Sequence, residues 1–591
     1  MPRDLAGIGL SVGPEPGFRI ERAGLRGHAS LLLECLLKRP LRAPPALYEF
    51  ARGDERRFRD ILRGACAVVP MARHDAFSRA RSVAEGAAAL TRMPVRLVMI
   101  VRDGEGGIAA TVRDLLAQTH RDWSLVVAGE RAPSSHGDSR IAGRSWDEAG
   151  RWGDLMGEGA AFGLLDPGDR LAPDALARLA AALSPPAGPS PDLAYADHLS
   201  EAEGRTSPVL KPGWSPDLAL ASGYHGAAAL VAPHLAASLA ALPLGPSRDA
   251  ATAWEIAVAA AAASAVHVPR PLATLAGRPA DPGRRARLLA DRLRGIGSPA
   301  EPRIRDGVLD LHWPLPEPAP LVSIVIPSRD RLDLIERVTR GVLSETAYSA
   351  IEMVIVDNGS TDPGVLAHYE TLKRDPRVAV LPFPAPFNFS AMVNAGVAAS
   401  SGSVVVLLNN DVAVLEPDWL DAMVRQALRP EVGAVGAKLL YGDGTLQHAG
   451  VVVGLGGRAG HILRRRPADT PGRLGRLRVA HEVSAVTAAC LAVSRTKYDA
   501  VGGFDAEAFP VDFNDVDFCL RLGAAGWKTV WTPLATLAHL ESVSRGPSVG
   551  EKRARFEREA ATFVGRWREA IRHDPFYHPA LSLTTFGEDL E

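Results

Sequence analysis

Three groups of acidic and amide side chains in this sequence have the types and spacing to do chemistry. The first group spans residues 357–362, the second is residues 409–411, and the third spans residues 512–517. The first two groups each follow an apolar run typical of a buried strand. Ligands of open parallel sheets bind where such strands end. The sequence therefore predicts a ligand site at this edge of a sheet.

The first group is an acidic turn, Asp357-Asn-Gly-Ser-Thr-Asp. Asp357 is placed to accept hydrogen bonds from a ribose or a base. An acid at this point is also a common cap on the helix that follows, and taken alone that interpretation is the stronger one.

The second group offers a metal ligand. Hard cations such as Mg²⁺ and Mn²⁺ prefer carboxylate oxygen and bridge the phosphates of a nucleoside diphosphate, which makes Asp411 a candidate ligand. One carboxylate is a weak site, and His539 would complete it, although a lone histidine is more often packed than metal-bound. Ser544 and Arg545 follow His539 and carry groups that bind phosphate.

The third group stands at the start of a helix predicted from about residue 512. An acid on the first turn of a helix is stabilised by the helix dipole, which suits a general base. Spacing alone does not choose between Asp512, Asp515 and Asp517. An ordinary acid-rich helix start is the alternative.

These groups lie in the second of two similar segments, each of which alternates strands and helices and so predicts a parallel sheet. The first segment has runs at residues 95–101, 108–118 and 123–128, and the second repeats them at residues 321–327, 332–343 and 351–357. The predicted fold class is therefore α/β, with two copies of one mostly parallel sheet in tandem.

A chain of 591 residues is longer than one hydrophobic core usually supports, so several domains are expected. The predicted organisation has five parts. A proline-rich linker separates the two copies, because its prolines continue neither a helix nor a sheet. The parts are a helical lead-in (1–90), the first copy (91–300), the linker (301–320), the second copy (321–546), and a C-terminal helix and tail (547–591).

Composition narrows the classes of partner. The chain has 67 Lys and Arg against 68 Asp and Glu, so no global charge draws it to nucleic acid. Its four cysteines are too scattered for a disulfide framework, which favours a reducing, cytoplasmic compartment. No apolar run is long enough to predict a transmembrane segment, and the start lacks the apolar core of a secretion signal.

The second copy resembles family 2 glycosyltransferases of the GT-A fold, especially rhamnosyltransferase-like enzymes of bacterial surface polysaccharides. The segments that carry the resemblance are, in order, VSIVIPSRDR, IVDNGST, FNFSAMVNAGVAASSG, VVVLLNNDVAVL, AACLAVSRTKYDAVGGFDAEAF, NDVDFCLRL and AHLESVSRG.

The resemblance implies a role for each matching residue. Asp515 would be the general base, and Asp411 and His539 would bind a divalent metal, Mg²⁺ or Mn²⁺. Ser544, Arg545 and Asp512 would contact phosphate or acceptor. The residues that would bind the nucleotide sugar are Pro327, Ser328, Arg329, Asp357, Asn394, Asn409 and Asn410. Asn409 and Asn410 depart from the family's pattern, in which many members carry acids at these positions.

The resemblance also implies an activity. An inverting transferase would move a sugar from a UDP or dTDP donor, with rhamnose as one candidate sugar, to a hydroxyl of a cell-surface glycan or lipid-linked glycan precursor. Asp515 would take the proton while the metal stabilises the departing diphosphate. Such an enzyme would be cytoplasmic, with peripheral contact at the inner face of the membrane. A nonenzymatic glycan-binding or scaffold protein built from two GT-A-like domains is the alternative.

The first copy resembles the same family but lacks its reactive side chains. Ala128-Gly129 stands in place of Asp357, Asp166 and Asp169 are what remains of the second acidic group, and no histidine follows residues 269–272. We therefore predict an inactive copy with a structural or acceptor-positioning role.

Two further segments carry predictions. Residues 454–478 are rich in glycine and arginine, which predicts a mobile loop that serves either as a basic lid or as a solvated surface. Residues 550–572 have one apolar face, which predicts a helix packed on the enzyme in preference to one on a membrane surface.

Overall fold

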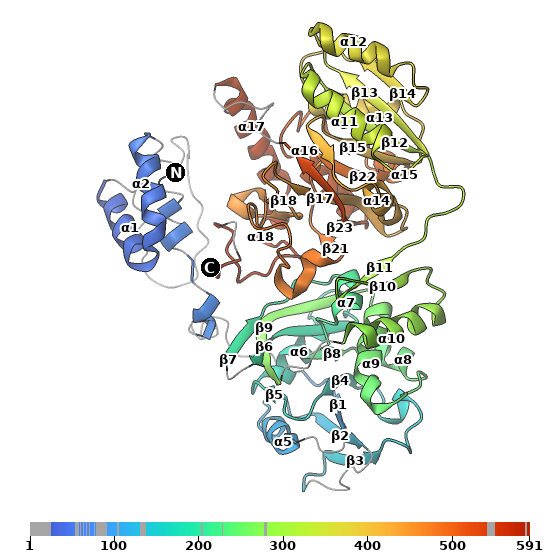
Figure 1. The fold of residues 1–591 in the computed structure, drawn as a ribbon. Coiled ribbons are helices and arrows are strands. Elements are labelled where there is room, and N and C mark those ends of the chain that lie inside the picture. Colours follow the sequence, from blue (N-terminus) through green and yellow to red (C-terminus); the bar gives the residue numbers. More distant parts are fainter. Residues whose placement is uncertain are drawn as a thin grey trace. The chain divides into compact units, whose positions relative to one another are not determined.

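The computed structural model divides into two compact units, residues 1–70 with 589–591, and residues 71–588. The residues that the structure describes are 25–53, 58, 61–62, 64–66, 68–69, 71–75, 77–78, 91–102, 106–129, 137–202, 205–226, 228–276, 281–540, 550–585 and 588–591. Figure 1 shows the elements in sequence colours.

The first unit is helical in the part that the structure describes, as predicted for the lead-in. Its elements are α1 (Leu25–Lys38), η1 (Pro40–Arg42) and α2 (Ala43–Ala51). Cys35, Phe58 and Leu62 are buried in its small core. Val69 pairs with Leu590 in an isolated β-bridge, which joins the chain's last residues to this unit.

The first α/β copy is built on a nine-stranded sheet in the order β3-β2-β1-β4-β8-β6-β9-β5, with β7 beside β6. The strands are β1 (Val95–Val101), β2 (Trp123–Gly129), β3 (Ile141–Ser145), β4 (Ala161–Leu165), β5 (Arg170–Leu171), β6 (Leu193–Ala202), β7 (Arg205–Val209), β8 (Ala229–Val231) and β9 (Ala265–Ala276). The helices are α5 (Ile108–Leu116), η3 (Trp152–Asp154), α6 (Ala175–Leu183), α7 (Pro216–Ser222), α8 (Pro233–Leu239), α9 (Ser247–Ala261) and α10 (Pro282–Gly295), with η2 (Met71–Arg73) before them.

The second copy has a ten-stranded sheet in the order β14-β13-β12-β15-β22-β17-β23-β16, with β18 beside β17 and β21 beside β23. The strands are β12 (Val322–Ser328), β13 (Ile351–Asp357), β14 (Val378–Pro382), β15 (Val404–Leu408), β16 (Val412–Val414), β17 (Val432–Leu440), β18 (Leu446–His448), β21 (His481–Val483), β22 (Cys490–Ser494) and β23 (Lys528–His539). The helices are α11 (Leu332–Ser344), α12 (Pro363–Leu372), α13 (Phe389–Ala398), α14 (Trp419–Ala427), α15 (Arg495–Ala500) and α16 (Asn514–Ala524), followed by α17 (Glu551–Arg566) and α18 (Arg568–Arg572).

The two sheets repeat one arrangement. In each, four parallel strands are followed by an antiparallel strand, β8 in the first copy and β22 in the second. In each, the last strand of the sheet pairs antiparallel to its neighbour, β5 to β9 and β16 to β23. The predicted α/β fold in tandem copies is therefore confirmed.

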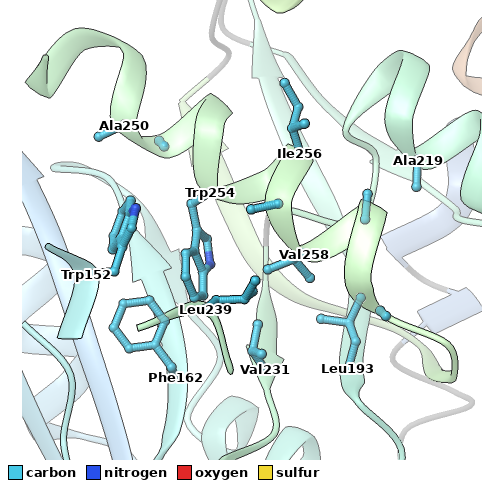
Figure 2. Close-up of a cluster of buried hydrophobic side chains, with 14 of the residues drawn as sticks. Trp152, Phe162, Leu193, Ala219, Val231, Leu239, Ala250, Trp254, Ile256 and Val258 are labelled. Carbon is cyan, nitrogen blue, oxygen red and sulfur yellow. The ribbon is translucent and has the colours of Figure 1, made fainter. Parts of the chain in front are cut away.

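Buried apolar runs form the central strands, as the sequence predicts. All five residues of β15 and all seven of β12 are buried. In the first copy, Trp254 of α9 packs on Trp152 and Phe162, with ring centroids 4.8 Å away in each case (Figure 2). Large aromatic side chains therefore fill the core beneath this helix.

The predicted linker differs from the structure at residues 301–312. This stretch forms an antiparallel hairpin of β10 (Glu301–Arg305) and β11 (Val308–His312). Its turn is Asp306-Gly307, whose positive φ angles of 50° and 74° suit a tight hairpin turn. Proline is tolerated in such a strand because a two-stranded sheet consists only of edges.

A buried ion pair joins the two copies. Arg429 contacts both carboxylate oxygens of Asp217, and the two side chains are 5% and 6% exposed. Its guanidinium also lies 4.3 Å from the ring centre of Trp313. Nearby, Ser215 donates a hydrogen bond to Glu482, and burial with the neighbouring Asp217 raises the pKa of Glu482 to about 7.

Asp217→Ala should lower the free energy of unfolding by about 3–5 kcal/mol, because it leaves the buried Arg429 charge without its main partner. Scanning calorimetry would measure this as a drop in the melting temperature. The matched control is Asp421→Ala, which removes the half-exposed 3.6 Å pair with Arg425 and should cost under about 1 kcal/mol. Adding Arg429→Met to Asp217→Ala should recover part of the loss. Equal melting temperatures for the two single variants would contradict the account.

Candidate functional site

Strand pairing brings Asp411 and His539 together. Val412 of β16 lies opposite His539 of β23, and the amide of Leu540 donates to the carbonyl of Asp411 at 2.9 Å. The Asp411 Oδ1 atom lies 3.1 Å from His539 Nε2, and the side chains are only 7% and 12% exposed. The two residues predicted to share a metal are therefore in contact.

Gln447 of β18 orients the imidazole of His539. The Gln447 Nε2 atom donates to the His539 carbonyl at 3.2 Å, so its Oε1, 2.7 Å from His539 Nδ1, must accept. Nδ1 therefore carries the proton, and in the neutral ring Nε2 presents a lone pair to Asp411. A lone pair facing a carboxylate oxygen at this distance favours a cation between them.

The Asp411 and His539 pair fits a divalent metal. One carboxylate oxygen and one imidazole nitrogen suit Mn²⁺ or Mg²⁺, and the hydrogen bond from Nδ1 to Gln447 is the kind that orients metal-binding histidines. Asn409 Nδ2 lies 3.4 Å from the same Nε2 atom. Within the described residues no third histidine, cysteine or acid joins this pair.

The ends of β12 and β13 lie side by side, as predicted for a donor site. Ser328 is opposite Asp357, and the Oγ atom of Ser328 accepts a hydrogen bond from Asn410 Nδ2 at 3.2 Å. Pro327 is buried within β12, and the side chain of Arg329 is 61% exposed. The loops after these strands therefore meet beside residues 409–411.

Asp357 holds the turn that follows β13. Its carboxylate accepts from the Ser360 hydroxyl at 2.5 Å and from the Ser360 amide at 3.1 Å. Asp362, and not Asp357, caps α12, since it accepts from the Gly364 amide at 2.7 Å. A contact between Asp357 and a nucleoside stays a prediction.

Asn394 holds two segments of the second copy together. Its Oδ1 accepts from the Tyr498 hydroxyl at 2.5 Å and from the Phe504 amide at 2.9 Å, while its Nδ2 donates to the Phe504 carbonyl at 2.8 Å. These bonds fasten α13 to the segment after α15. A contact between Asn394 and the donor stays a prediction.

The structure separates the three acids near the start of α16. Asp517 is fully buried and bonds to Arg521, Arg566 and Trp567, so its carboxylate is part of the packing. The carboxylate of Asp512 lies 3.9 Å from Arg555 of α17. Asp515 is half-buried and accepts from the Ala488 amide at 3.1 Å. Asp515 is therefore the best placed of the three to act as a base.

A short turn at residues 487–489 lies between Asp515 and the Asp411–His539 pair. The Asn409 amide donates to the Ala489 carbonyl at 3.0 Å, next to the amide of Ala488 that binds Asp515. The Thr487 amide faces His448, the neighbour of Gln447, at 3.4 Å. The base candidate and the Asp411 pair therefore flank one turn.

Ser544 and Arg545, which are predicted to contact phosphate or acceptor, lie outside the described residues. The predicted mobile loop, residues 454–478, instead contains η4 (Leu455–Gly457), β20 (Ala459–His461), which pairs with β19 (Val451–Val453), and η5 (Arg473–Arg478). Several of its arginines form ion pairs, including Arg458 with Glu557 at 2.7 Å. The segment therefore has regular structure, and a role as a basic lid stays a prediction.

Comparisons with known proteins agree with this geometry. Residues 323–497 match the model of glycosyl transferase family 2. This part of the second copy therefore resembles the family 2 glycosyltransferases. The match ends before Asp515 and His539, so the roles of these two residues rest on the structure and the sequence pattern.

Relatives match beyond the family 2 domain. An uncharacterized protein of Sinorhizobium fredii is 38% identical over 72% of this chain and 49% of its own length, and the O-antigen biosynthesis protein RfbC of Myxococcus xanthus is 33% identical over 86% of this chain and 42% of its own. An N-acetylglucosaminyl-diphospho-decaprenol L-rhamnosyltransferase of Mycobacterium tuberculosis is 29% identical over 39% of this chain and 81% of its own length. The chain thus spans less than half of the first two relatives.

Among solved structures, the mannosyltransferase PcManGT of Pyrobaculum calidifontis matches 45% of this chain and 70% of its own, at 20% identity and a TM-score of 0.32. No helix in the described ranges is long and apolar enough to cross a membrane. Cys35, Cys66, Cys490 and Cys519 are all free thiols, in line with the expected lack of disulfides.

The first copy has the strand pairing of the second with other side chains at the matching positions. Arg170 pairs with Thr274 where Val412 pairs with His539, so Thr274 stands in place of the histidine. Gly129, opposite Val101, likewise stands in place of Asp357.

Asp169 is the first-copy counterpart of Asp411, since each precedes the first residue of its short strand. Its Oδ2 accepts from the Asp166 amide at 2.9 Å, and burial raises its pKa to about 7. A carboxyl that is partly protonated near neutral pH is a weak metal ligand.

A second polar cluster lies in the first copy. His267 and His578 place their Nε2 atoms 2.8 Å and 2.7 Å from the oxygens of buried Asp197. The Ala580 amide donates to His578 Nδ1 at 3.0 Å, so the proton of the neutral ring is on Nε2 and points at Asp197. Although burial opposes ionisation, hydrogen bonds from both histidines hold the pKa of Asp197 below its usual range. The cluster is a set of hydrogen bonds that joins His578 to the first copy, and it is not a metal site, because His578 Nε2 has no lone pair for a metal.

Asp169→Asn should stabilise the protein increasingly as pH rises. The folded pKa of Asp169 is above its unfolded value, so its contribution to stability is full at low pH and is lost as pH rises through about 7. The difference in free energy of unfolding between Asp169→Asn and wild type should grow by about 2 kcal/mol in favour of the variant between pH 5 and pH 8. Melting temperatures of variant and wild type at the two pH values check this. A difference that stays constant with pH would show that Asp169 is ionised in the folded protein.

Proposed function

We propose that the chain is an inverting glycosyltransferase that moves a sugar from a nucleotide-sugar donor to a hydroxyl of a glycan or lipid-linked glycan precursor. The observation that carries this proposal is the contact between Asp411 and His539, whose Nε2 lone pair faces Asp411 because Gln447 accepts from Nδ1 on the other side of the ring. Asp515 lies beside the same turn. A family 2 domain with this arrangement can bind a diphosphate and activate a hydroxyl.

Asp411 and His539 would hold Mg²⁺ or Mn²⁺ between the protein and the donor. When bound, this metal would neutralise the charge that develops on the departing diphosphate. Ser328 and Asn410 line the adjoining loop, and Asp357 fixes the turn beside it, which supports a nucleoside site at the ends of β12 and β13.

Asp515 would accept the proton of the acceptor hydroxyl as its oxygen attacks the anomeric carbon. One direct displacement of this kind inverts the configuration at that carbon. The amide of Ala488 orients the carboxylate, and the oxygens retain further lone pairs for the acceptor. The base would come from helix α16, whereas the metal ligands would come from the turn before β16 and from the end of β23, so the two halves of the site are held by different elements.

The names of the relatives support a surface-glycan substrate. One is an O-antigen biosynthesis protein and another is a rhamnosyltransferase named for a diphospho-decaprenol acceptor. We therefore include UDP and dTDP sugars, rhamnose among them, as donors. We place the reaction in the cytoplasm, with peripheral contact at the inner face of the membrane.

We also propose that the first copy is inactive and serves as a support or positions the acceptor. Thr274 and Gly129 at the positions of His539 and Asp357 support this role. A nonenzymatic glycan-binding protein is the competing function, and turnover of a donor distinguishes the two.

Asp515→Asn should lower turnover by about 100-fold or more, because loss of a general base costs about 10²–10⁴ in rate. The assay is Mn²⁺-dependent release of UDP or dTDP from a panel of UDP sugars and dTDP-rhamnose, with water as acceptor. Glu370→Gln, the same type of change at an exposed surface pair, is the matched control and should keep full activity. A fully active, folded Asp515→Asn protein would remove Asp515 from the mechanism.

A further inference from the structure

The C-terminal helix α17 binds the segment that leads into the base-bearing helix α16. The Glu559 Oε2 atom accepts from the amides of Val511 and Asp512, at 3.1 Å and 2.6 Å. Glu559 is only 3% exposed, and Arg555 lies 3.4 Å from its other oxygen. One buried carboxylate thus fixes two consecutive amides just before Asp515.

The end of α17 and the start of α18 hold the first turn of α16 from the other side. Asp517 Oδ1 accepts from Arg566 and from the Trp567 indole, each at 2.9 Å. Its Oδ2 accepts from Arg521 at 2.7 Å. Because Asp517 is fully buried, these charge-assisted bonds are strong.

Between these contacts lies a strained residue. Phe513, immediately before α16, has a φ of 63°, a left-handed conformation that costs a bulky residue roughly 1 kcal/mol or more. Its ring stacks on Phe563 of α17 with centroids 5.0 Å apart and contacts Phe556 at 5.5 Å. The apolar face of α17 thus packs on the protein, as predicted, and holds the turn that directs Asp515.

We propose that α17, with Trp567 directly after it, acts as a positioning element for Asp515, because it holds residues 511–513 before Asp515 and Asp517 after it. This inference rests on the proposed function, in which Asp515 is the base. Outside its own helix, Asp515 contacts Ala488, so the entry into α16 sets the direction of its carboxylate. A displacement of about 1 Å at a reacting group can cost about 100-fold in rate.

Two substitutions of Glu559 distinguish a positioning role from simple packing, because they differ in whether an oxygen remains to accept from the two amides. Glu559→Gln keeps an oxygen that can accept from the two amides, whereas Glu559→Ala does not. We expect Glu559→Ala to lower kcat for donor hydrolysis by about 10–100-fold with the donor KM within about twofold, and Glu559→Gln to restore kcat to within about fivefold of wild type. Trp567→Phe keeps an aromatic ring but loses the indole N–H that donates to Asp517, and it should lower kcat several-fold. Glu557→Ala, on the same helix and paired with Arg458, should leave kcat and KM unchanged.

Hydrogen–deuterium exchange supplies a readout that does not depend on the donor. In Glu559→Ala the amides of Val511 and Asp512 should exchange faster, while those of β12 and β15 keep their protection; Glu559→Gln should resemble wild type. Unchanged exchange at these two amides would overturn the inference, and so would a kcat equal to wild type despite faster exchange. Equal damage to kcat, KM and melting temperature would show a purely structural role. If the wild type hydrolyses no donor in the panel, or if Asp515→Asn is active, the proposed function fails instead.

Discussion

The antiparallel pairing of β16 with β23 is the constraint on which the site depends. It sets Val412 opposite His539, and so brings the carboxylate of Asp411 within 3.1 Å of an imidazole from a distant part of the chain. The first copy has the same pairing, between Arg170 and Thr274, without the imidazole. The two copies therefore share the backbone arrangement at this point and differ in the side chains that it carries.

Much of this arrangement could be predicted from the sequence, because its causes are local. Five buried apolar residues predict β15, and the acids that follow such strands predict where a ligand binds. Gln447 could not be predicted in this way. A single glutamine in a three-residue strand has no recognisable pattern, and its role arises only when β18 approaches β23.

The choice among the three acids before and within α16 also required the structure. Asp512, Asp515 and Asp517 are equivalent on spacing, but α17 and α18 pair with the first and third. The hydrogen bonds of Asn394 to Tyr498 and Phe504 likewise join segments that are distant in the sequence, and no local pattern predicts them. The prolines near residues 301–312 favour a linker, whereas the Asp306-Gly307 turn between them favours the observed hairpin.

The C-terminal segment links the parts that function requires. Beyond α18, Asp574 bonds to Ser484 and Val453 of the second copy, and His578 bonds to Asp197 of the first. With the Arg429 and Asp217 pair, these contacts join the two copies. The central claim is that the second copy alone binds a metal-bridged nucleotide. Calorimetric titration of the full chain with UDP and with dTDP, each with Mn²⁺, tests this claim most directly. We expect one Mn²⁺-dependent nucleotide site per chain, which is lost in Asp411→Ala and in His539→Ala and kept in Asp169→Asn. Undiminished nucleotide binding in the first two variants would contradict the claim.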